Sequence, residues 1–384
     1  MLDAITLTNF KAFRDTRVPL SAMTLLTGIN SSGKSSVLQA LAAIRQSSSL
    51  HRNKGDRNLL LNGALTELGN GQDVLHADWE ETPEIRGPYI RFQLEEDGHR
   101  IAWNFDYLPG SDALPLMTMV REPSSAPAKT GISSLLGGLD PGLFQYLRAD
   151  RVSPATTYER SHEVAVEQAF LGTHGEHTAN YLRHHQEESL DVLAPLQHPE
   201  ARSSTFLSHV QAWLGEISPG VNLDTTGIDG TDLVRLSYGF GGRAGLSASN
   251  PRRPTNVGFG LTYTLPIIVA CLTAKPGTLL MLENPEAHLH PRGQTQIAFL
   301  LAQAAAAGAQ LIVETHSDHI LNGLRLTVKE EVLSPETVTL HYFRHQGTGA
   351  TEITSPSIDP NGMLSQWPDG FFDEWDNAVM RLLG

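Results

Sequence analysis

The 384 residues are enough for two or three domains, and 40% hydrophobic with 18% charged residues is typical of a globular protein rather than a disordered one. The 42 acidic and 28 basic residues give a net charge of −14, which argues against a protein that coats nucleic acid by bulk electrostatics. One cysteine cannot form an internal disulfide, and neither a signal peptide nor a membrane-spanning helix is predicted, so we expect a cytoplasmic protein.

The first part of the chain predicts strands and one helix. Apolar and polar residues alternate over residues 1–20, which predicts a hairpin at a sheet edge. AMTLLTG, residues 22–28, predicts a short buried strand, and SSVLQALAAIRQSSS, residues 35–49, predicts a helix. Residues 55–125 carry further strand patterns, with a hairpin turn at EEDGH, and residues 121–140 are rich in Pro, Ser and Gly and indicate a loop.

The rest of the chain changes character twice. Residues 160–215 carry helical patterns, including HEVAVEQAFL, and residues 221–248 return to strands. From residue 256 onward helices and strands alternate, which predicts a parallel sheet with helices packed on it. We therefore expect an α/β fold in three parts, namely residues 1–159, a helical insert over 160–220, and residues 221–384.

A phosphate-binding loop is predicted between the strand and the helix. GINSSGKS, residues 28–35, fits the pattern G-x-x-x-x-G-K-[ST] without a mismatch. Its glycines let backbone N–H groups face phosphate oxygens, and the helix N-terminus adds partial positive charge. We expect Lys34 to reach the β- and γ-phosphates and the Ser35 hydroxyl to bind Mg²⁺. The predicted nucleotide contacts are Gly28, Asn30, Ser31, Ser32, Gly33, Lys34, Ser35 and Ser36.

Two glutamates follow a later apolar strand. In GTLLMLENPEAHLHP, residues 277–291, four apolar residues lead to Glu283, and Glu286 follows three positions later. A P-loop fold places a carboxylate at such a strand end beside Mg²⁺, so we assign Glu283, with Ser35, to the metal site. A carboxylate just beyond the strand can accept a proton from an attacking water, and we assign this catalytic role to Glu286.

A histidine ends the next apolar strand. LIVETHSDHIL, residues 311–321, places His316 at a strand tip, and ligands bind at the carboxyl edge of a parallel sheet. We therefore expect His316 to hydrogen-bond the γ-phosphate or the water.

A glycine-rich helix start offers a second anion site. In NVGFGLTYTLP, residues 256–266, Gly258 and Gly260 open a predicted helix, and a helix N-terminus attracts anions. Because the P-loop already takes the phosphates of its own chain, this site suits a nucleotide bound to another subunit.

Together these segments resemble the ABC-type ATPase heads of the SMC, RecF and OLD group. LTNFKAFRDTRVPLSAMTLLTGINSSGKSSVLQAL looks like the opening strands and Walker A P-loop, LENPEAHLHP like the Walker B motif with its D-loop, and ETHSDHIL like the switch histidine. RPTNVGFGLTYTLPIIV and WPDGFFDE narrow the resemblance to a stand-alone bacterial family of AAA ATPases often found beside restriction and phage-defence genes. The resemblance covers nearly the whole chain and is specific over residues 1–45 and 250–375.

The resemblance implies a P-loop NTPase with an ABC-ATPase-like head, an antiparallel β subdomain and a helical insert. It implies ATP and Mg²⁺ as ligands and a head-to-tail homodimer, with each ATP between the P-loop of one subunit and Gly258–Gly260 of the other. Gly258 stands where the signature serine is usual, and Glu283 where aspartate is commoner. On the same grounds Gln145 is a candidate for the Q-loop, and Arg148 or Arg151 for a place near the nucleotide.

The resemblance also implies an effector and leaves two alternatives. The chain after His316 is too short for the TOPRIM nuclease of the OLD relatives, so we expect a separate nuclease or toxin, controlled in antiphage defence. One alternative is a DNA-repair ATPase whose dimer clamps DNA, so nucleic acid stays open as a partner. The other is a scaffold or sensor that binds ATP with little turnover. The histidines at 174, 177, 184 and 185 favour a solvated helical face over a metal site.

Overall fold

The computed structural model divides the chain into two compact units. We call them the terminal unit, Met1–Leu139 with Ser334–Gly384, and the central unit, Asp140–Leu333. The structure describes residues 1–47, 57–122, 142–186, 192–241, 250–345, 351–368, 370–372 and 374–383, and most of the loop predicted over 121–140 lies outside these ranges. No helix in this described part is long and apolar enough to cross a lipid bilayer.

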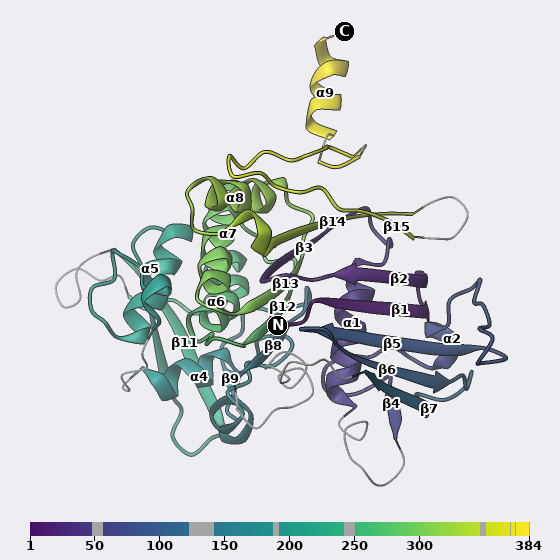
Figure 1. Ribbon diagram of the computed structural model, residues 1–384. Helices are drawn as coiled ribbons and strands as arrows, with labels where there is room; N and C mark the ends of the chain where they lie inside the picture. The colour runs from purple at the N-terminus through teal and green to yellow at the C-terminus, as the bar shows by residue number, and fades with distance from the viewer. Residues whose placement is uncertain are drawn as a thin grey trace. The chain divides into compact units, whose positions relative to one another are not determined.

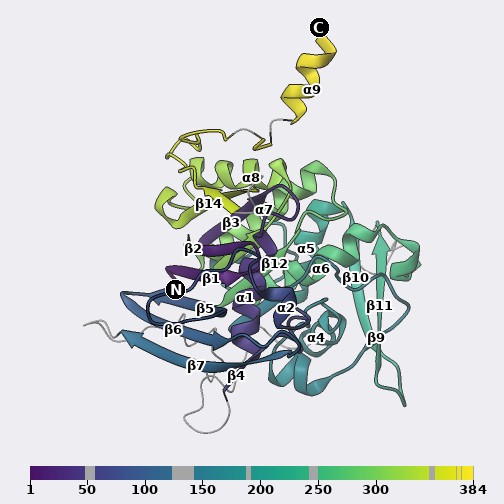
Figure 2. The same ribbon diagram turned by 90° about the vertical axis from the view of Figure 1, so that its right-hand side faces the viewer.

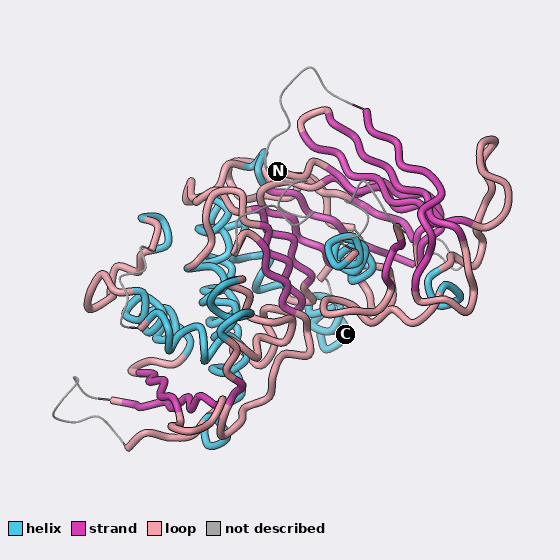
Figure 3. The backbone as a smooth tube through the Cα atoms, turned by 90° about the horizontal axis from the view of Figure 1, so that it is seen from below, coloured by secondary structure: helices cyan, strands magenta, loops and turns pink. Residues whose placement is uncertain are grey.

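A six-stranded antiparallel sheet lies in the terminal unit, and its strands run side by side in Figures 1 and 3. The two predicted hairpins are confirmed, and each is closed by a short turn. Aromatic rings of neighbouring strands pack edge to face, with the Phe92 ring 4.9 Å from Phe10 and 5.8 Å from Phe105. The strand order is β2 (Phe13–Pro19), β1 (Ala4–Phe10), β5 (Tyr89–Glu96), β6 (His99–Asp106), β7 (Ala113–Glu122) and β4 (Asn58–Leu60).

The predicted strand, glycine-bounded loop and helix are also confirmed in the terminal unit. Strand β3 spans Met23–Gly28 and helix α1 spans Lys34–Gln46. Strand β3 pairs in parallel with β14 (Val338–His345), and β14 pairs with the antiparallel strand β15 (Thr351–Thr354). The remaining helices of this unit are α2 (Gly71–Val74), η5 (Pro335–Thr337) and α9 (Glu374–Leu383).

The aromatic tail WPDGFFDE packs in part against β14. The Phe371 side chain is buried, and its ring lies 5.3 Å from that of Tyr342 in an edge-to-face contact. Trp367 contacts the Phe371 ring at 5.4 Å while its own side chain stays 49% exposed. The tail therefore contributes Phe371 to the core of the terminal unit.

Three parallel strands form the centre of the central unit. Strand β12 (Leu279–Glu283) lies between β8 (Phe144–Leu147) and β13 (Gln310–Glu314), and Figure 1 shows helices beside them. The four residues Leu279–Leu282 are buried, as expected for a strand covered on both faces. The helices are α6 (Phe259–Leu272), α7 (Pro291–Ala306) and α8 (Asp318–Lys329), which confirms the predicted alternation.

The rest of the central unit holds short helices and a small sheet. The helical elements are η2 (Glu163–Glu167), α4 (Thr178–His185), η3 (Ala194–Leu196), α5 (Phe206–Ile217) and η4 (Pro254–Asn256). Strands β10 (Val221–Gly227), β11 (Leu233–Phe240) and β9 (Tyr158–Glu159) form the small antiparallel sheet, which is labelled in Figure 2.

One predicted helix is wrong. HEVAVEQAFL, residues 162–171, forms only the five-residue π-helix η2. Ala169 adopts a φ of 47°, which breaks the helix. The Gln145 side chain then holds the extended chain beyond it, because its amide nitrogen donates to the Ala169 carbonyl (2.6 Å) and its oxygen accepts from the Leu171 N–H (3.1 Å). A tertiary contact has therefore overridden the local propensity.

We expect Gly28→Ala to destabilise the protein. A Cβ at Gly28, where φ is 132°, would lie 2.1 Å from the Phe343 carbonyl oxygen on β14. Strain of this kind costs about 1–3 kcal/mol, and the clash adds to it. Gly215→Ala is the control, because a Cβ there meets nothing within 4 Å inside α5, and we expect it to stabilise by about 0.5–1 kcal/mol. Thermal or urea unfolding measures both, and equal stability of the two variants would contradict the close packing of β3 on β14.

Candidate functional site

The P-loop of the terminal unit is shaped by three residues with positive φ. These are Gly28 (132°), Ser31 (61°) and Gly33 (101°). A Cβ at Gly33 would lie 2.9 Å from the Ala12 side chain and 3.0 Å from the Phe13 ring, so this position needs glycine for space as well as for φ. Helix α1 follows directly, so its N-terminal N–H groups border the loop.

The Lys34 ammonium is held against its own loop. The Lys34 side chain is only 3% exposed, and its Nζ donates to the carbonyls of Gly28 (3.1 Å) and Ile29 (2.7 Å). The Ser32 hydroxyl donates to the Ile29 carbonyl at 2.8 Å, and Thr351 of β15 donates to the Ser32 carbonyl at 3.0 Å. A buried cation enclosed by backbone is a fitting receptor for phosphate oxygens.

The other predicted P-loop contacts differ in exposure. Asn30 and Ser31 are exposed at the tip of the loop, and Ser35 is half-buried in the first turn of α1. Ser36 is buried, and its N–H donates to the Gly33 carbonyl at 3.0 Å. Ser35 is therefore the half-buried hydroxyl in the first turn of α1, which is where we expect a Mg²⁺ ligand.

In the central unit, Glu283 is held by a residue of β8 and by the segment that follows β8. The Tyr146 hydroxyl donates to Glu283 Oε1 at 2.6 Å, and the Ala149 N–H donates to Oε2 at 3.1 Å. Burial, and then the neighbouring Glu283 carboxylate, raise the pKa of Tyr146, so the phenol keeps its proton and remains a donor. Both carboxylate oxygens of Glu283 thus have fixed directions, and their remaining lone pairs can accept from a hydrated cation.

Glu286 and His316 lie together, on the turns that follow β12 and β13. The His316 N–H donates to Glu286 Oε1 at 2.8 Å. Glu286 Oε2 is buried and accepts no hydrogen bond from any described residue. Glu283 stands directly opposite Glu314 in the register of the two parallel strands. The structure therefore brings Glu283, Glu286 and His316 to one sheet edge, whereas the P-loop belongs to the terminal unit.

The predicted signature glycines have different surroundings. Gly258 caps the N-terminus of α6 and is exposed, and a Cβ at this position would meet nothing within 4 Å. A Cβ at Gly260 would lie 2.8 Å from the His288 carbonyl oxygen. Close packing on His288 is therefore a sufficient reason for glycine at 260, while Gly258 keeps an open helix N-terminus.

Arg151 is the residue that sequence reasoning placed only loosely. Its side chain is 3% exposed, and its guanidinium donates to the carbonyls of Glu283 (2.7 Å) and Asn284 (2.6 Å). Arg148, the other arginine considered, is paired instead with Asp150 at 3.1 Å. The Gln145 amide bonds the backbone of Ala169 and Leu171, so its hydrogen bonds are made there and not with Glu283. Arg151 and Glu283 are 132 positions apart in the chain, so local sequence patterns could not reveal this contact.

The histidines near residue 180 make local contacts. His174 lies 3.3 Å from Asp150, and the rings of His184 and His185 lie 4.7 Å apart. Within the described ranges, no group of three or more His, Cys, Asp or Glu side chains is arranged to hold a metal ion.

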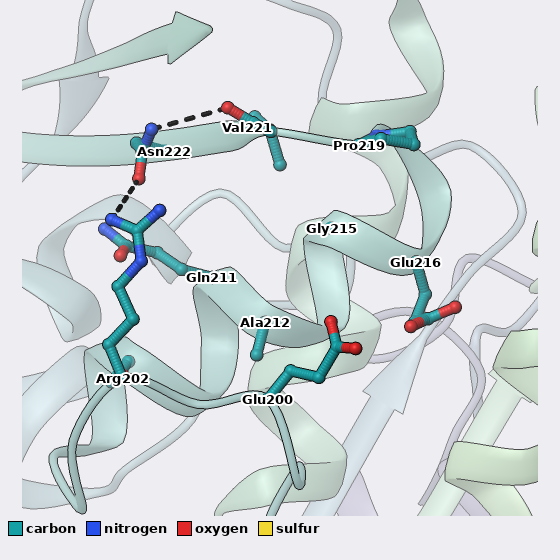
Figure 4. Close-up of a pocket in the computed structure, with 11 residues that line it drawn as sticks. Glu200, Arg202, Gln211, Ala212, Gly215, Glu216, Pro219, Val221 and Asn222 are labelled. Atoms are coloured by element: carbon teal, nitrogen blue, oxygen red, sulfur yellow. Dashed lines mark hydrogen bonds between the residues drawn. The ribbon is translucent and has the colours of Figure 1, made fainter. Parts of the chain in front are cut away.

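A separate polar cavity of about 220 Å³ lies beside α5 (Figure 4). Ala212 and Gly215 of α5 line it, and so do the carboxylates of Glu200 and Glu216. Arg202, which also lines the cavity, donates to Asn222 at 3.4 Å. The Glu216 carboxylate lies 3.7 Å from the Arg292 guanidinium. None of the predicted site residues lines this cavity.

Comparison with known proteins adds to this geometry. Residues 23–322 match the family described as "AAA domain, putative AbiEii toxin, Type IV TA system", and residues 333–382 match one described as "Protein of unknown function (DUF3696)". No curated protein matches the chain in sequence. The fold is similar to a crystal structure of an SmcHead bound to the C-winged helix domain of ScpA, with a TM-score of 0.55 and 16% identity over 93% of this chain and 98% of that chain.

A second solved structure agrees. It is an Smc head domain with an extended coiled coil, bound to the C-terminal domain of ScpA and derived from Pyrococcus furiosus, with a TM-score of 0.52 and 14% identity over 100% of both chains. At these identities the likeness concerns the fold alone. The expected fold class, a P-loop head with an antiparallel sheet and parallel strands, is therefore confirmed.

We expect Tyr146 and Glu283 to be coupled energetically. A hydrogen bond to a charged group contributes about 1.5–3 kcal/mol, and Tyr146→Phe removes only the hydroxyl. A double-mutant cycle with Tyr146→Phe and Glu283→Gln, measured by urea unfolding, should show coupling of about 1–2 kcal/mol. Tyr158→Phe with Glu283→Gln is the control and should be additive. Additivity in both cycles would show that the 2.6 Å contact contributes nothing.

Proposed function

The chain belongs to the AAA-domain family that includes AbiEii-type toxins of type IV toxin–antitoxin systems, and from this premise we propose that it binds and hydrolyses ATP with Mg²⁺. In this proposal ATP joins two copies head to tail, and hydrolysis lets them part. In this proposal the P-loop supplies the phosphate contacts, and Glu283, Glu286 and His316 supply the groups needed for hydrolysis.

The observation that carries the proposal is the state of Glu286. One carboxylate oxygen is fixed by the His316 N–H, and the other is buried with its lone pairs unused by the described residues. Leaving a carboxylate oxygen unsatisfied costs free energy, so a water or ligand that donates to this oxygen is favoured. An oriented oxygen with a free lone pair is what a general base requires to hold a water and accept its proton.

The other residues have supporting roles. Lys34 and the N–H groups at the start of α1 would hold the phosphate oxygens, since both are positive and face the loop. Ser35 and Glu283 would hold Mg²⁺, which when bound neutralises charge on the phosphates. His316, exposed at its strand tip, would donate a hydrogen bond to the γ-phosphate or the water.

Two features support pairing of two copies. Gly258 leaves the N-terminus of α6 open, where it can attract the γ-phosphate held by a partner subunit. The next residue, Phe259, is 53% exposed, so an apolar ring beside this helix start is available for contact with a partner subunit. A partner subunit's nucleotide and P-loop are the surface we propose.

The role in defence rests on the family rather than on any residue. Its description names an AAA domain, a putative AbiEii toxin and a type IV TA system, and on this ground we propose that the ATP-driven change controls a toxin or nuclease effector. The proposal includes a cytoplasmic location and a separate effector chain as the partner.

We expect Glu286→Gln to separate binding from turnover. Removing a general base lowers the rate about 10²–10⁴-fold, so phosphate release should fall by that factor while affinity for a fluorescent ATP analogue is kept. Lys34→Ala should lose the affinity itself, and Glu200→Gln, an exposed glutamate of the central unit, is the control with wild-type behaviour. A wild-type rate at background with intact binding would replace this proposal by the scaffold or sensor alternative.

The DNA-clamp alternative has its own test. Arg252 and Arg253 are exposed just before η4, and they are a local basic feature on an acidic chain. We expect no ATP-stimulated binding of duplex DNA at about 150 mM salt by fluorescence anisotropy. Binding that ATP strengthens, that weakens steeply with salt and that Arg252→Ala with Arg253→Ala abolishes would favour the clamp instead.

A further inference from the structure

Arg151 carries a buried positive charge that binds backbone rather than a single carboxylate. Its Nη1 donates to the carbonyls of Arg148 (3.1 Å) and Glu283 (2.7 Å), and its Nη2 donates to the carbonyl of Asn284 (2.6 Å). The planar guanidinium thus spans two consecutive carbonyls at the end of β12. A lysine ammonium, which is a point charge, cannot reproduce this fork.

The charge is kept in place against a desolvation penalty. Burial lowers the pKa of Arg151 to about 10, and the carboxylates of Glu286 and Glu283 and the Tyr263 side chain act in the opposite direction. The guanidinium therefore stays charged at neutral pH. A buried charge is often no better for stability than an apolar residue of similar size, so stability alone is a weak reason for this arginine.

The turn that Arg151 holds is strained. Asn284 and His288 both adopt positive φ, at 44° and 63°, and neither is a glycine. Such conformations persist where the surroundings over-determine them, and they cluster at functional sites. Between them lies Glu286, whose carboxylate meets the His316 N–H. Support at Asn284 therefore bears directly on where Glu286 stands.

The same guanidinium contacts α6, the helix that begins at the predicted signature glycines. Its Cζ lies 5.7 Å from the centre of the Tyr263 ring on α6. The Tyr263 ring also packs against the His288 ring, with ring centres 4.6 Å apart. The centre of the Phe259 ring lies 5.6 Å from that of His288. Gly260 permits this approach, because any side chain there would strike the His288 carbonyl. The turn after β12 and the first turns of α6 are thus held together by Arg151 and by His288.

We propose that Arg151 is a positioning residue that couples the open N-terminus of α6 to the placement of Glu286. Anything that binds at Gly258, such as a nucleotide carried by a second copy of this chain, acts on the turns of α6 that contact Arg151 and His288, and both of these residues contact or belong to the turn that carries Glu286. The inference rests on the proposed function, because it assigns to Arg151 the orientation of the base that hydrolysis needs.

The test compares Arg151 with an exposed arginine further along the chain. We expect Arg151→Met and Arg151→Lys to lower kcat for phosphate release by about 100-fold, the loss typical of a misplaced catalytic group, with KM and ATP affinity unchanged. Arg160→Met is the matched control, since Arg160 is an exposed arginine nine residues further along the chain and takes no part in the site, and it should keep the wild-type kcat. Tyr263→Leu, which keeps the carbonyl contacts of Arg151, should lower kcat less than Arg151→Met does.

Chemical rescue separates positioning from folding. In Arg151→Ala, methylguanidinium added to the full-length protein should restore part of kcat, because it can span the same carbonyls, and methylammonium should not. Thermal melts of every variant show whether the fold is kept; if Arg151→Ala does not fold, the kcat of Arg151→Lys against KM decides alone.

The outcomes distinguish two failures. An active wild type with an equally active Arg151→Met variant, or a rise in KM at constant kcat, would overturn the coupling role and leave the proposed function standing. A wild type without ATP turnover would overturn the proposed function and this inference with it.

Discussion

The hydrogen bond from the His316 N–H to Glu286 is the contact on which the arrangement of the central unit's site depends. It joins the turns that leave two adjacent parallel strands, β12 and β13, so residues 30 positions apart share one sheet edge. A parallel pair gathers its carboxyl ends at one edge by construction, and this geometry is why such edges hold ligands. The bond uses one oxygen of Glu286, and the other oxygen accepts no hydrogen bond from any described residue.

Support for that edge comes from one short stretch of chain, formed by the end of β8 and the residues just after it. Tyr146 and Ala149 orient the Glu283 carboxylate, and Arg151 holds the main chain of the next turn. Hydrogen bonds to charged groups are stronger than those between neutral ones, so these contacts add to the hydrogen bonds by which β12 pairs with its neighbours.

In the terminal unit, contacts with neighbouring strands hold the P-loop in place. The close approach of Gly28 to Phe343, together with the Thr351 hydroxyl on the Ser32 carbonyl, ties the loop to β14 and β15. These strands come from residues 338–354, inside the segment that matches the family of unknown function. That segment thus contributes to the wall of the P-loop, which supports the view that it belongs to the ATPase rather than to a separate module.

Local sequence was sufficient for the P-loop and the strand ends. GINSSGKS, LENPEAH and ETHS each carry their chemistry within a few residues, and glycine spacing and apolar runs depend only on neighbours in the chain. The helix over 162–171 failed for the opposite reason, because the Gln145 amide, distant in sequence, bonded the backbone that a helix would have used. The roles assigned to Lys34, Glu283, Glu286 and His316, and the three-part division of the chain, remain predictions.

Sequence alone also determined the fold class, since alternating helices and strands after residue 256 admit few other architectures. Only the tertiary structure decided which side chains support the site. Tyr146 and Arg151 reach Glu283 across more than 130 residues of chain, and no periodicity or motif records a contact between segments that meet only when the sheet forms. Packing of Gly260 on His288 is of the same kind, because a glycine required by a neighbour's carbonyl looks, in sequence, like a glycine required by a ligand.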